Sequence, residues 1–182
     1  MPLKFPSLDK VTRSFMIEEF EIRQQELPTL LSSFLSDEGR QKYPTLVKEA
    51  FETFDAEWLL KELQPFLLSP DDTSKSSLAS FYKRIQMFVE SEFNRYYISG
   101  ICRIALNEHI TEVVVCSIKP LKKNDQISRE KRGTKIVVDT LLNELRMDRP
   151  VEASLQVPLG IAASLRARKS IESHTNLVNW TY

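Results

Sequence analysis

The sequence predicts a mainly helical α+β protein: a helical N-terminal half, one long central helix, and a small C-terminal sheet with one helix packed against it. Three observations support this class. Apolar residues at helical spacing run from Ser77 to Glu108, a β-branched run follows at Val113–Ile118, and the 182 residues include only four glycines. So few glycines argue against a barrel or a sandwich, which needs many tight turns. We expect a helical region over 1–76 and a long helix plus a small α/β region over 77–182, in one compact domain.

The long helix is the strongest element. Its apolar residues recur at steps of three and four from Phe81 to Ile104, so they line one face. At ~1.5 Å per residue it would be roughly 48 Å long, which exceeds the ~35 Å width expected for a domain of this size. We therefore expect either a kink near Ser91 or Gly100 or a helix that spans two lobes. Gly100 lies on the apolar stripe, where it allows close approach of a neighbouring backbone. The opposite face carries Lys83, Arg84, Glu90, Ser91, Asn94, Arg95, Ser99 and Arg103.

Shorter helices are expected before it. The first runs from about Leu8 to Gln25, and a second begins at Pro28, because proline is best tolerated in a first helical turn. The apolar face of the first helix comprises Val11, Phe15 and Ile22. Its mostly solvated residues are Glu18, Glu19, Glu21 and Arg23.

Turn and cap residues divide the next segment. Ser36–Gly39 is typical of a stop and a turn, so a helix is expected over Pro44–Phe54. Asp55 is a good N-cap for a helix over Ala56–Leu63. The clearest loop follows at Ser69–Ser77, and we interpret it as a connection rather than a flexible linker.

The C-terminal half contains the strands. Val113–Ile118 is apolar almost without a break, which favours a central strand buried on both faces. A helix is expected over Lys135–Met147, and Ser154–Val157 has the pattern of a strand. Ile161–Arg168 is either a hairpin partner of that strand or a short helix, and its alternation slightly favours the strand.

Composition restricts the class of protein. Hydrophobic residues make up 42% and charged residues 27%, a globular balance, and no apolar run is long enough to span a membrane. The first six residues contain no apolar signal region, so we expect a cytoplasmic protein. Cys102 and Cys116 are too few for a disulfide framework, and we expect two reduced, buried thiols.

The net charge of zero conceals an uneven distribution. Residues 1–92 carry 11 Lys/Arg and 16 Asp/Glu, whereas residues 93–182 carry 14 Lys/Arg and 9 Asp/Glu. A basic half of this kind indicates an anionic partner. Alternatively, the two halves face each other within the fold or across a dimer.

Catalytic signals are weak. His109 and His174 are the only histidines and lie 65 residues apart, so we expect no metal site and no cofactor. His109 is too far from Cys116 to act as its base, because an extended chain separates residues seven positions apart by about 20 Å. Gly133 and Thr134 resemble a phosphate cradle at the start of a helix only partly, and an ordinary N-cap at Thr134 is favoured.

A metal-dependent nuclease is the enzymatic alternative. Glu112 opens the predicted strand and Lys119 closes it, but the close spacing of an acid and a lysine that many nucleases use is missing. Glu90 and Glu92 of the long helix are positioned to approach that strand. This geometry is permissive only.

The most distinctive charged feature is the basic stretch at residues 119–135, with seven cations in 17 residues, which suits contacts to phosphates. Its cations are Lys119, Lys122, Lys123, Arg129, Lys131, Arg132 and Lys135. Additional candidates are Arg95 and Arg103, which lie near Tyr96 and Tyr97, and Arg166, Arg168 and Lys169. Plain solubility explains the stretch equally well, and core packing explains the tyrosines.

The sequence therefore favours a non-enzymatic intracellular binding protein or complex subunit, whose basic C-terminal half contacts nucleic acid or an acidic protein. Homo- or hetero-oligomers are compatible with this hypothesis, and no membrane partner is expected. The alternative is a nucleic-acid-processing enzyme, either a nuclease or a nucleotide-binding enzyme, with its site near the 113–118 strand.

Overall fold

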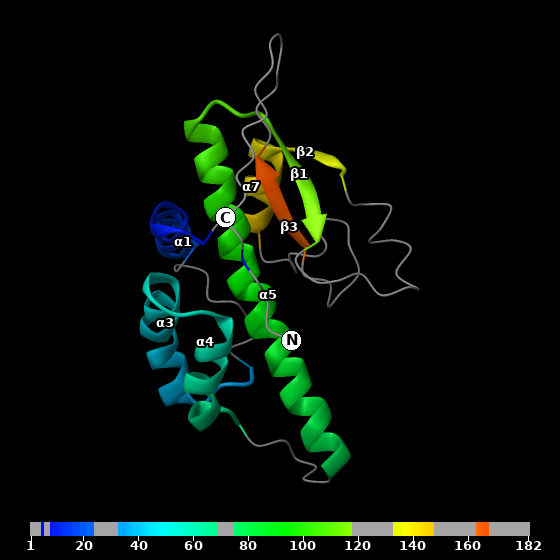
Figure 1. The fold of residues 1–182 in the computed structure, drawn as a ribbon. Helices are drawn as coiled ribbons and strands as arrows, with labels where there is room; N and C mark the ends of the chain where they lie inside the picture. Colours follow the sequence, from blue (N-terminus) through cyan, green and yellow to red (C-terminus); the bar gives the residue numbers. More distant parts are fainter. Residues whose placement is uncertain are drawn as a thin grey trace.

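The computed structural model describes residues 5, 8–23, 33–68, 75–117, 133–147 and 163–167. Most of the described residues are helical, and three short strands form a small antiparallel sheet. The predicted mainly helical α+β class is therefore confirmed (Figure 1). The elements in chain order are α1 (Lys10–Arg23), α3 (Asp37–Glu52), α4 (Ala56–Leu63), a 3₁₀ turn (Gln64–Phe66), α5 (Lys75–Asn107), β1 (Glu112–Ser117), β2 (Lys135–Val137), α7 (Val138–Arg146) and β3 (Ala163–Ala167).

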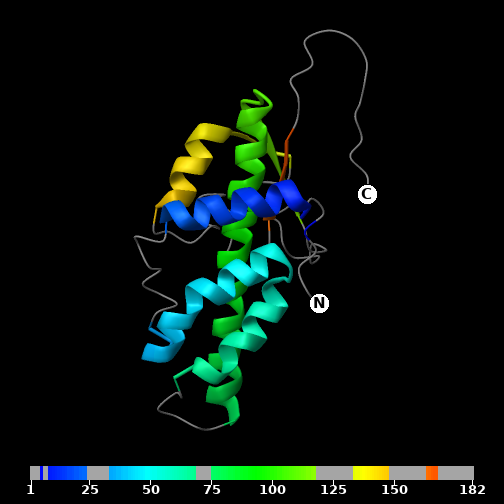
Figure 2. The ribbon, with the colours of Figure 1, turned by 90° about the vertical axis from the view of Figure 1, so that its left-hand side faces the viewer.

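Helix α5 is the spine of the molecule. It is one α-helix of 33 residues, about 50 Å long at the usual rise. Helix α4 lies along its N-terminal half, α7 and the sheet lie beside its C-terminal half, and α1 crosses its middle (Figure 2). Other elements therefore pack along most of its length, and the buried residues of α1, α3, α4, α5 and α7 form one core cluster.

The middle of α5 is enclosed on all sides. Every residue from Phe93 to Cys102 is buried, including Asn94, Arg95 and Ser99 on the polar face. Arg95 and Ser99 bond internally: Arg95 Nη1 donates to the Leu145 carbonyl at 2.8 Å, and Ser99 Oγ donates to the Arg95 carbonyl at 3.0 Å. The close approach expected at Gly100 is confirmed, since a Cβ there would lie 2.9 Å from the carbonyl oxygen of Thr12 in α1.

Helix α1 is oriented differently from the sequence prediction. Val11 and Ile22, expected in the core, are 55% and 53% exposed, whereas Glu19 and Arg23 are buried. That expectation was wrong because tertiary ion pairs, described below, hold the charged side of α1 against α5 and α7. The buried residues of α1 are Thr12, Met16, Glu19, Phe20 and Arg23.

The N-termini of α3 and α4 show which of the expected helix starts are correct. Helix α3 begins at Asp37 rather than Pro44, because Ser36 Oγ accepts a hydrogen bond from the Gly39 N–H at 3.2 Å and serves as N-cap. The expected stop signal is thus a helix start, and Pro44 lies inside the helix. The N-cap at Asp55 is confirmed, with Oδ1 accepting from the Trp58 N–H at 2.9 Å.

The sheet has the order β2-β1-β3, and both pairings are antiparallel. Strand β1 is central, as predicted. The expected helix over Lys135–Met147 starts three residues late, because Lys135–Val137 pair with β1 before α7 begins. Of the two interpretations of Ile161–Arg168, the strand is confirmed at Ala163–Ala167, although it pairs with β1. The strand expected at Ser154–Val157 and the helix start at Pro28 lie outside the described residues.

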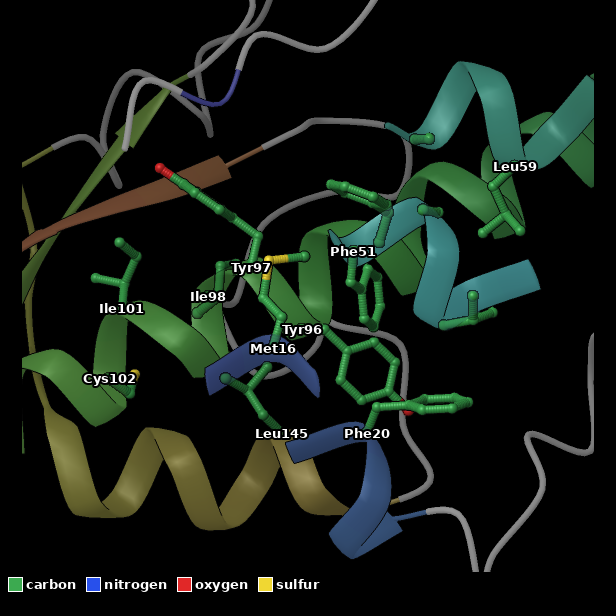
Figure 3. Close-up of a cluster of buried hydrophobic side chains, with 14 of the residues drawn as sticks. Met16, Phe20, Phe51, Leu59, Tyr96, Tyr97, Ile98, Ile101, Cys102 and Leu145 are labelled. Atoms are coloured by element: carbon green, nitrogen blue, oxygen red, sulfur yellow. The ribbon is translucent and has the colours of Figure 1, made fainter. Parts of the chain in front are cut away.

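Aromatic rings fill the core between α1, α3 and α5. Phe51 packs edge-on against Phe93, with ring centroids 5.3 Å apart, and Phe20 packs edge-on against Tyr96 at 5.5 Å. Figure 3 shows the rings of Phe20, Phe51 and Tyr96 beside Met16 of α1, with Cys102 and Leu145 at the α7 side of the same core. No helix in the described part of the chain has the length and apolar character that a membrane crossing requires.

Candidate functional site

The candidate site is the basic surface that the sequence placed in the C-terminal half. The structure describes the side chains of Lys135, Arg95 and Arg103, and the backbone position of Arg166. The other predicted site residues lie outside the described residues: Lys119, Lys122, Lys123, Arg129, Lys131, Arg132, Arg168 and Lys169.

Two of these basic positions, Lys135 and Arg166, flank the same residue of the central strand. Val114 of β1 pairs with Lys135 on one side and with Arg166 on the other. Positions 31 residues apart in sequence therefore lie in one row of the three-stranded sheet. The sequence alone indicated neither pairing, because Lys135 was expected in a helix and a strand at Ile161–Arg168 was expected to pair with Ser154–Val157.

The direction of the strands places the ends of the basic segment. Strand β1 ends at Ser117, which pairs with Ala163 at the start of β3. Segment 118–132, with six Lys/Arg and two Asp/Glu, therefore leaves the sheet at the end where β3 begins. Strand β3 ends at Ala167, opposite Val113. The end of β3 therefore lies at the opposite end of the sheet from Ser117.

Lys135 lies on the surface with a weakly held partner. Its Nζ is 2.7 Å from Oε2 of Glu112, and the two side chains are 59% and 44% exposed. An ion pair this exposed is worth about 0–1 kcal/mol, because water competes for both charges. Lys135 can therefore exchange Glu112 for an anionic ligand at little cost.

The partial phosphate cradle at Gly133 and Thr134 is absent. Gly133 has a φ of +88°, a backbone conformation that glycine adopts freely, and it turns the chain into strand β2. Helix α7 begins only at Val138, and its N-cap position, Val137, makes no side-chain cap. Both expectations for Thr134, as part of a cradle and as an N-cap, were wrong because Lys135–Val137 form a strand.

Arg103 is part of an ionic network that joins three helices. Its Nη1 donates to Oε1 of Glu19 at 2.8 Å, and its Nη2 donates to Oε2 of Glu18 at 3.0 Å. Arg146 of α7 donates to the same Glu19 carboxylate through Nε at 2.9 Å and Nη2 at 2.8 Å. Glu19, which is only 2% exposed, therefore ties α1 to α5 and α7.

The protonation of Glu19 follows from these contacts. Burial by itself raises the pKa of a carboxyl group, because it disfavours the charged form. The hydrogen bonds and positive charges of Arg146 and Arg103 outweigh that effect, and the pKa of Glu19 lies below its ordinary value. The hydrogen bonds that Arg146 donates to Glu19 in turn raise the pKa of Arg146. Glu19 is therefore ionised at neutral pH.

The side chain of Arg95 is buried and forms hydrogen bonds within the fold. Its Nε donates to Oε1 of Glu92 at 3.1 Å, and its Nη1 donates to the carbonyls of Leu145 and Met147 at 2.8 and 2.9 Å. These bonds satisfy carbonyls at the C-terminal end of α7. The arginine is 3% exposed, so the structure places it inside the fold rather than on the basic surface.

Tyr96 and Tyr97 are core residues, 3% and 0% exposed. Burial, with a further contribution from the nearby Glu92 carboxylate, raises the pKa of Tyr96 to about 12. Rings this deeply buried are unavailable for stacking on a nucleotide at the surface. The core interpretation of these two tyrosines is confirmed.

The groups considered for catalysis are dispersed or occupied. Glu90 accepts a hydrogen bond from Gln86 at 2.9 Å, and Glu92 is held by Arg95 and by Arg23 at 3.4 Å. Burial raises the pKa of the Cys102 thiol, which keeps it protonated. Among the described residues, no group of three His, Cys, Asp or Glu side chains could hold a metal ion.

The partners of Arg95 and Arg103 alter the interpretation of the charge asymmetry. Of the basic excess in residues 93–182, most belongs to segment 118–132, whereas Arg95, Arg103 and Arg146 have carboxylate or carbonyl partners within the fold. Sequence reasoning missed the role of Glu19 and Arg146. The available signal was a run of charged residues on a helix face, which indicates solvent as readily as an internal ion pair.

Comparisons of this chain with protein-family models, with curated proteins and with solved structures found no match.

Proposed function

We propose that this protein is a non-enzymatic binding subunit that contacts nucleic acid through the basic side of its small sheet. The surface comprises the row of Lys135 and Arg166 across β1 and the basic segment 118–132 that leaves the end of β1. Helices α5 and α7 pack against the sheet that carries the positions of Lys135 and Arg166.

The observation that supports this proposal most is the contrast between the basic positions. Arg95 and Arg103 have short bonds inside the fold, whereas Lys135 is 59% exposed and, among the described residues, pairs with the surface carboxylate of Glu112. An exposed lysine beside a connection of net charge +4 attracts phosphates through charge and counterion release. Such contacts require no particular base sequence.

The test is binding of fluorescently labelled single-stranded and duplex oligonucleotides, measured by anisotropy at several salt concentrations. We compare the wild type with a triple variant, Lys122→Ala, Lys123→Ala and Lys131→Ala. Each lost phosphate contact should reduce the slope of log K against log salt by about 0.7–0.9. The affinity should fall for all oligonucleotide sequences alike.

A matched control removes three exposed lysines of the helical body, Lys42→Ala, Lys61→Ala and Lys83→Ala, and should leave the affinity nearly unchanged. Absence of binding at low salt, or equal losses in both triple variants, would refute the proposal. If the protein bound a labelled polyglutamate peptide but no nucleic acid, the partner in the proposal would be an acidic protein instead of nucleic acid. Cleavage of the oligonucleotides with Mg²⁺ or Mn²⁺ would favour the enzymatic alternative.

A further inference from the structure

A stacked pair of aromatic rings, Phe54 exposed and Trp58 half-buried, lies at the corner between α3 and α4, away from the basic surface. The rings of Phe54 and Trp58 are stacked, with centroids 4.3 Å apart and planes 12° from parallel. Phe54 is 41% exposed, although a ring of its size usually lies in a core. The proposed nucleic-acid contact makes no use of this pair.

Hydrogen bonds hold the backbone that carries the two rings. Asp55 caps the N-terminus of α4 through the Trp58 N–H at 2.9 Å. On the other side, Arg13 Nη1 donates to the carbonyls of Ala50, Phe51 and Phe54 at 3.3, 2.6 and 3.1 Å. The backbone on each side of the corner is thus held before any partner arrives. A ligand that uses these rings loses little conformational entropy of the protein on binding.

The charge around the corner selects the kind of ligand. Residues 49–68 include five carboxylates and a single cation, Lys61. Asp55 is near Arg13, whose charge it partly balances. In the described part of the chain, Glu49, Glu52 and Glu57 are exposed and form no ion pair. The corner therefore repels a polyanion and attracts a cation.

We propose that this corner, defined by Phe54, Trp58, Glu52 and Glu57, is a docking site for an arginine-bearing segment of a partner protein. A guanidinium group over the exposed Phe54 ring gains a cation–π contact and lies within the field of the carboxylates. Arginine suits the site better than lysine, because its planar group stacks on a ring and is less strongly hydrated. This site is independent of the proposed nucleic-acid contact and lies on the acidic half of the chain.

The test uses synthetic octapeptides of alternating Gly and Arg, Gly and Lys, or Gly and Glu. In a Trp180→Phe background Trp58 is the only tryptophan, so its emission reports binding directly. We expect the arginine peptide to bind, the lysine peptide to bind about fivefold more weakly, and the glutamate peptide not to bind. Phe54→Leu retains the apolar contact but removes the ring, and should weaken the arginine peptide about fivefold.

Matched controls separate the corner from general attraction. Tyr82→Leu removes an exposed ring on α5, which is 50% exposed against 41% for Phe54. Asp37→Asn with Glu38→Gln removes two exposed carboxylates at the start of α3. Both variants should bind as the wild type does, whereas Glu52→Gln with Glu57→Gln should bind less. Circular dichroism shows whether each variant is folded. Equal binding of arginine and lysine peptides, no effect of Phe54→Leu, or a shift of Trp58 emission by single-stranded DNA would overturn the proposal.

Discussion

The ionic network between α1, α5 and α7 and the outer surface of the sheet use the same chemistry in opposite ways. In the network, Glu19 is 2% exposed and accepts hydrogen bonds from Arg103 and Arg146. On the sheet, Glu112 meets Lys135 at an equally short distance, but both side chains are exposed. Burial makes the first arrangement part of the fold and leaves the second free to exchange partners. Distance alone therefore does not distinguish a structural ion pair from a binding residue.

The largest expected effect comes from the centre of the network. Glu19→Ala leaves the guanidinium groups of Arg103 and Arg146 without their shared carboxylate, and removing one partner of a buried ion pair costs about 3–5 kcal/mol. Because these two arginines are 26% and 36% exposed, we expect the lower end, about 3 kcal/mol. Urea denaturation measures the change in the free energy of unfolding.

Glu21→Ala on the same helix is the matched control for Glu19. Its carboxylate is 54% exposed and pairs with Lys48 at 2.8 Å, so its loss should cost less than about 1 kcal/mol. Equal losses in the two variants would mean that the network contributes no more than a surface pair.

A smaller effect is expected where α1 crosses α5. In Gly100→Ala the new Cβ would lie 2.9 Å from the Thr12 carbonyl oxygen and 3.3 Å from Met16 Cγ, so α1 must move. Overpacking costs about 1–3 kcal/mol, and better helix propensity returns about 1 kcal/mol. We expect a net loss of about 1 kcal/mol by thermal denaturation. The exposed Ser80→Ala on the same helix should not destabilise, and a stabilised Gly100→Ala would contradict the close crossing.

The network also predicts a dependence of stability on pH. Burial disfavours the charged carboxylate of Glu19, but Arg146 and Arg103 lower its pKa below the ordinary 4.5. A carboxyl group with a lowered pKa in the folded state stabilises the protein above its unfolded pKa, and that contribution is lost as the pH falls through the folded pKa. The urea midpoint should therefore decrease below pH 4.5, and Glu19→Gln should reduce this decrease. An unchanged acid slope in Glu19→Gln would assign the effect to other carboxylates.

The smallest effect is expected at the sheet surface. Lys135→Ala removes the exposed ion pair with Glu112 and should change the free energy of unfolding by less than about 0.5 kcal/mol. The same variant should weaken oligonucleotide binding and lower its dependence on salt. A destabilisation as large as that of Glu19→Ala would remove the distinction between the two regions.

Local signals predicted several elements well. The apolar spacing predicted the start of α5 to within two residues. Its apolar stripe is also confirmed, because Ile85, Val89 and Phe93 are buried. The β-branched run predicted β1, and Asp55 predicted the start of α4. Each of these signals depends on neighbours in the sequence, such as a cap and the turn that follows it, or on a periodicity that the chain itself repeats.

Other features depend on partners that are distant in the sequence. Lys135–Val137 form a strand because β1 offers them backbone hydrogen bonds, which overcome the helical pattern of the segment that follows. The row of Lys135, Val114 and Arg166 exists only once both neighbours pair with β1. The candidate site could therefore be predicted as a set of basic residues but not as a surface.

The sequence by itself determined the class of fold, the long helix, the central strand and the segment that carries most of the basic excess, because periodicity and composition are local properties. Only the tertiary structure decided which charges belong to the interior. Glu19 and Arg23 of α1 look solvated in sequence, and Val11 looks buried, yet their positions are reversed. The physical reason is that a charged side chain can be buried when opposite charges and hydrogen bonds satisfy it. Glu19 finds those partners on α5 and α7, 84 and 127 residues away.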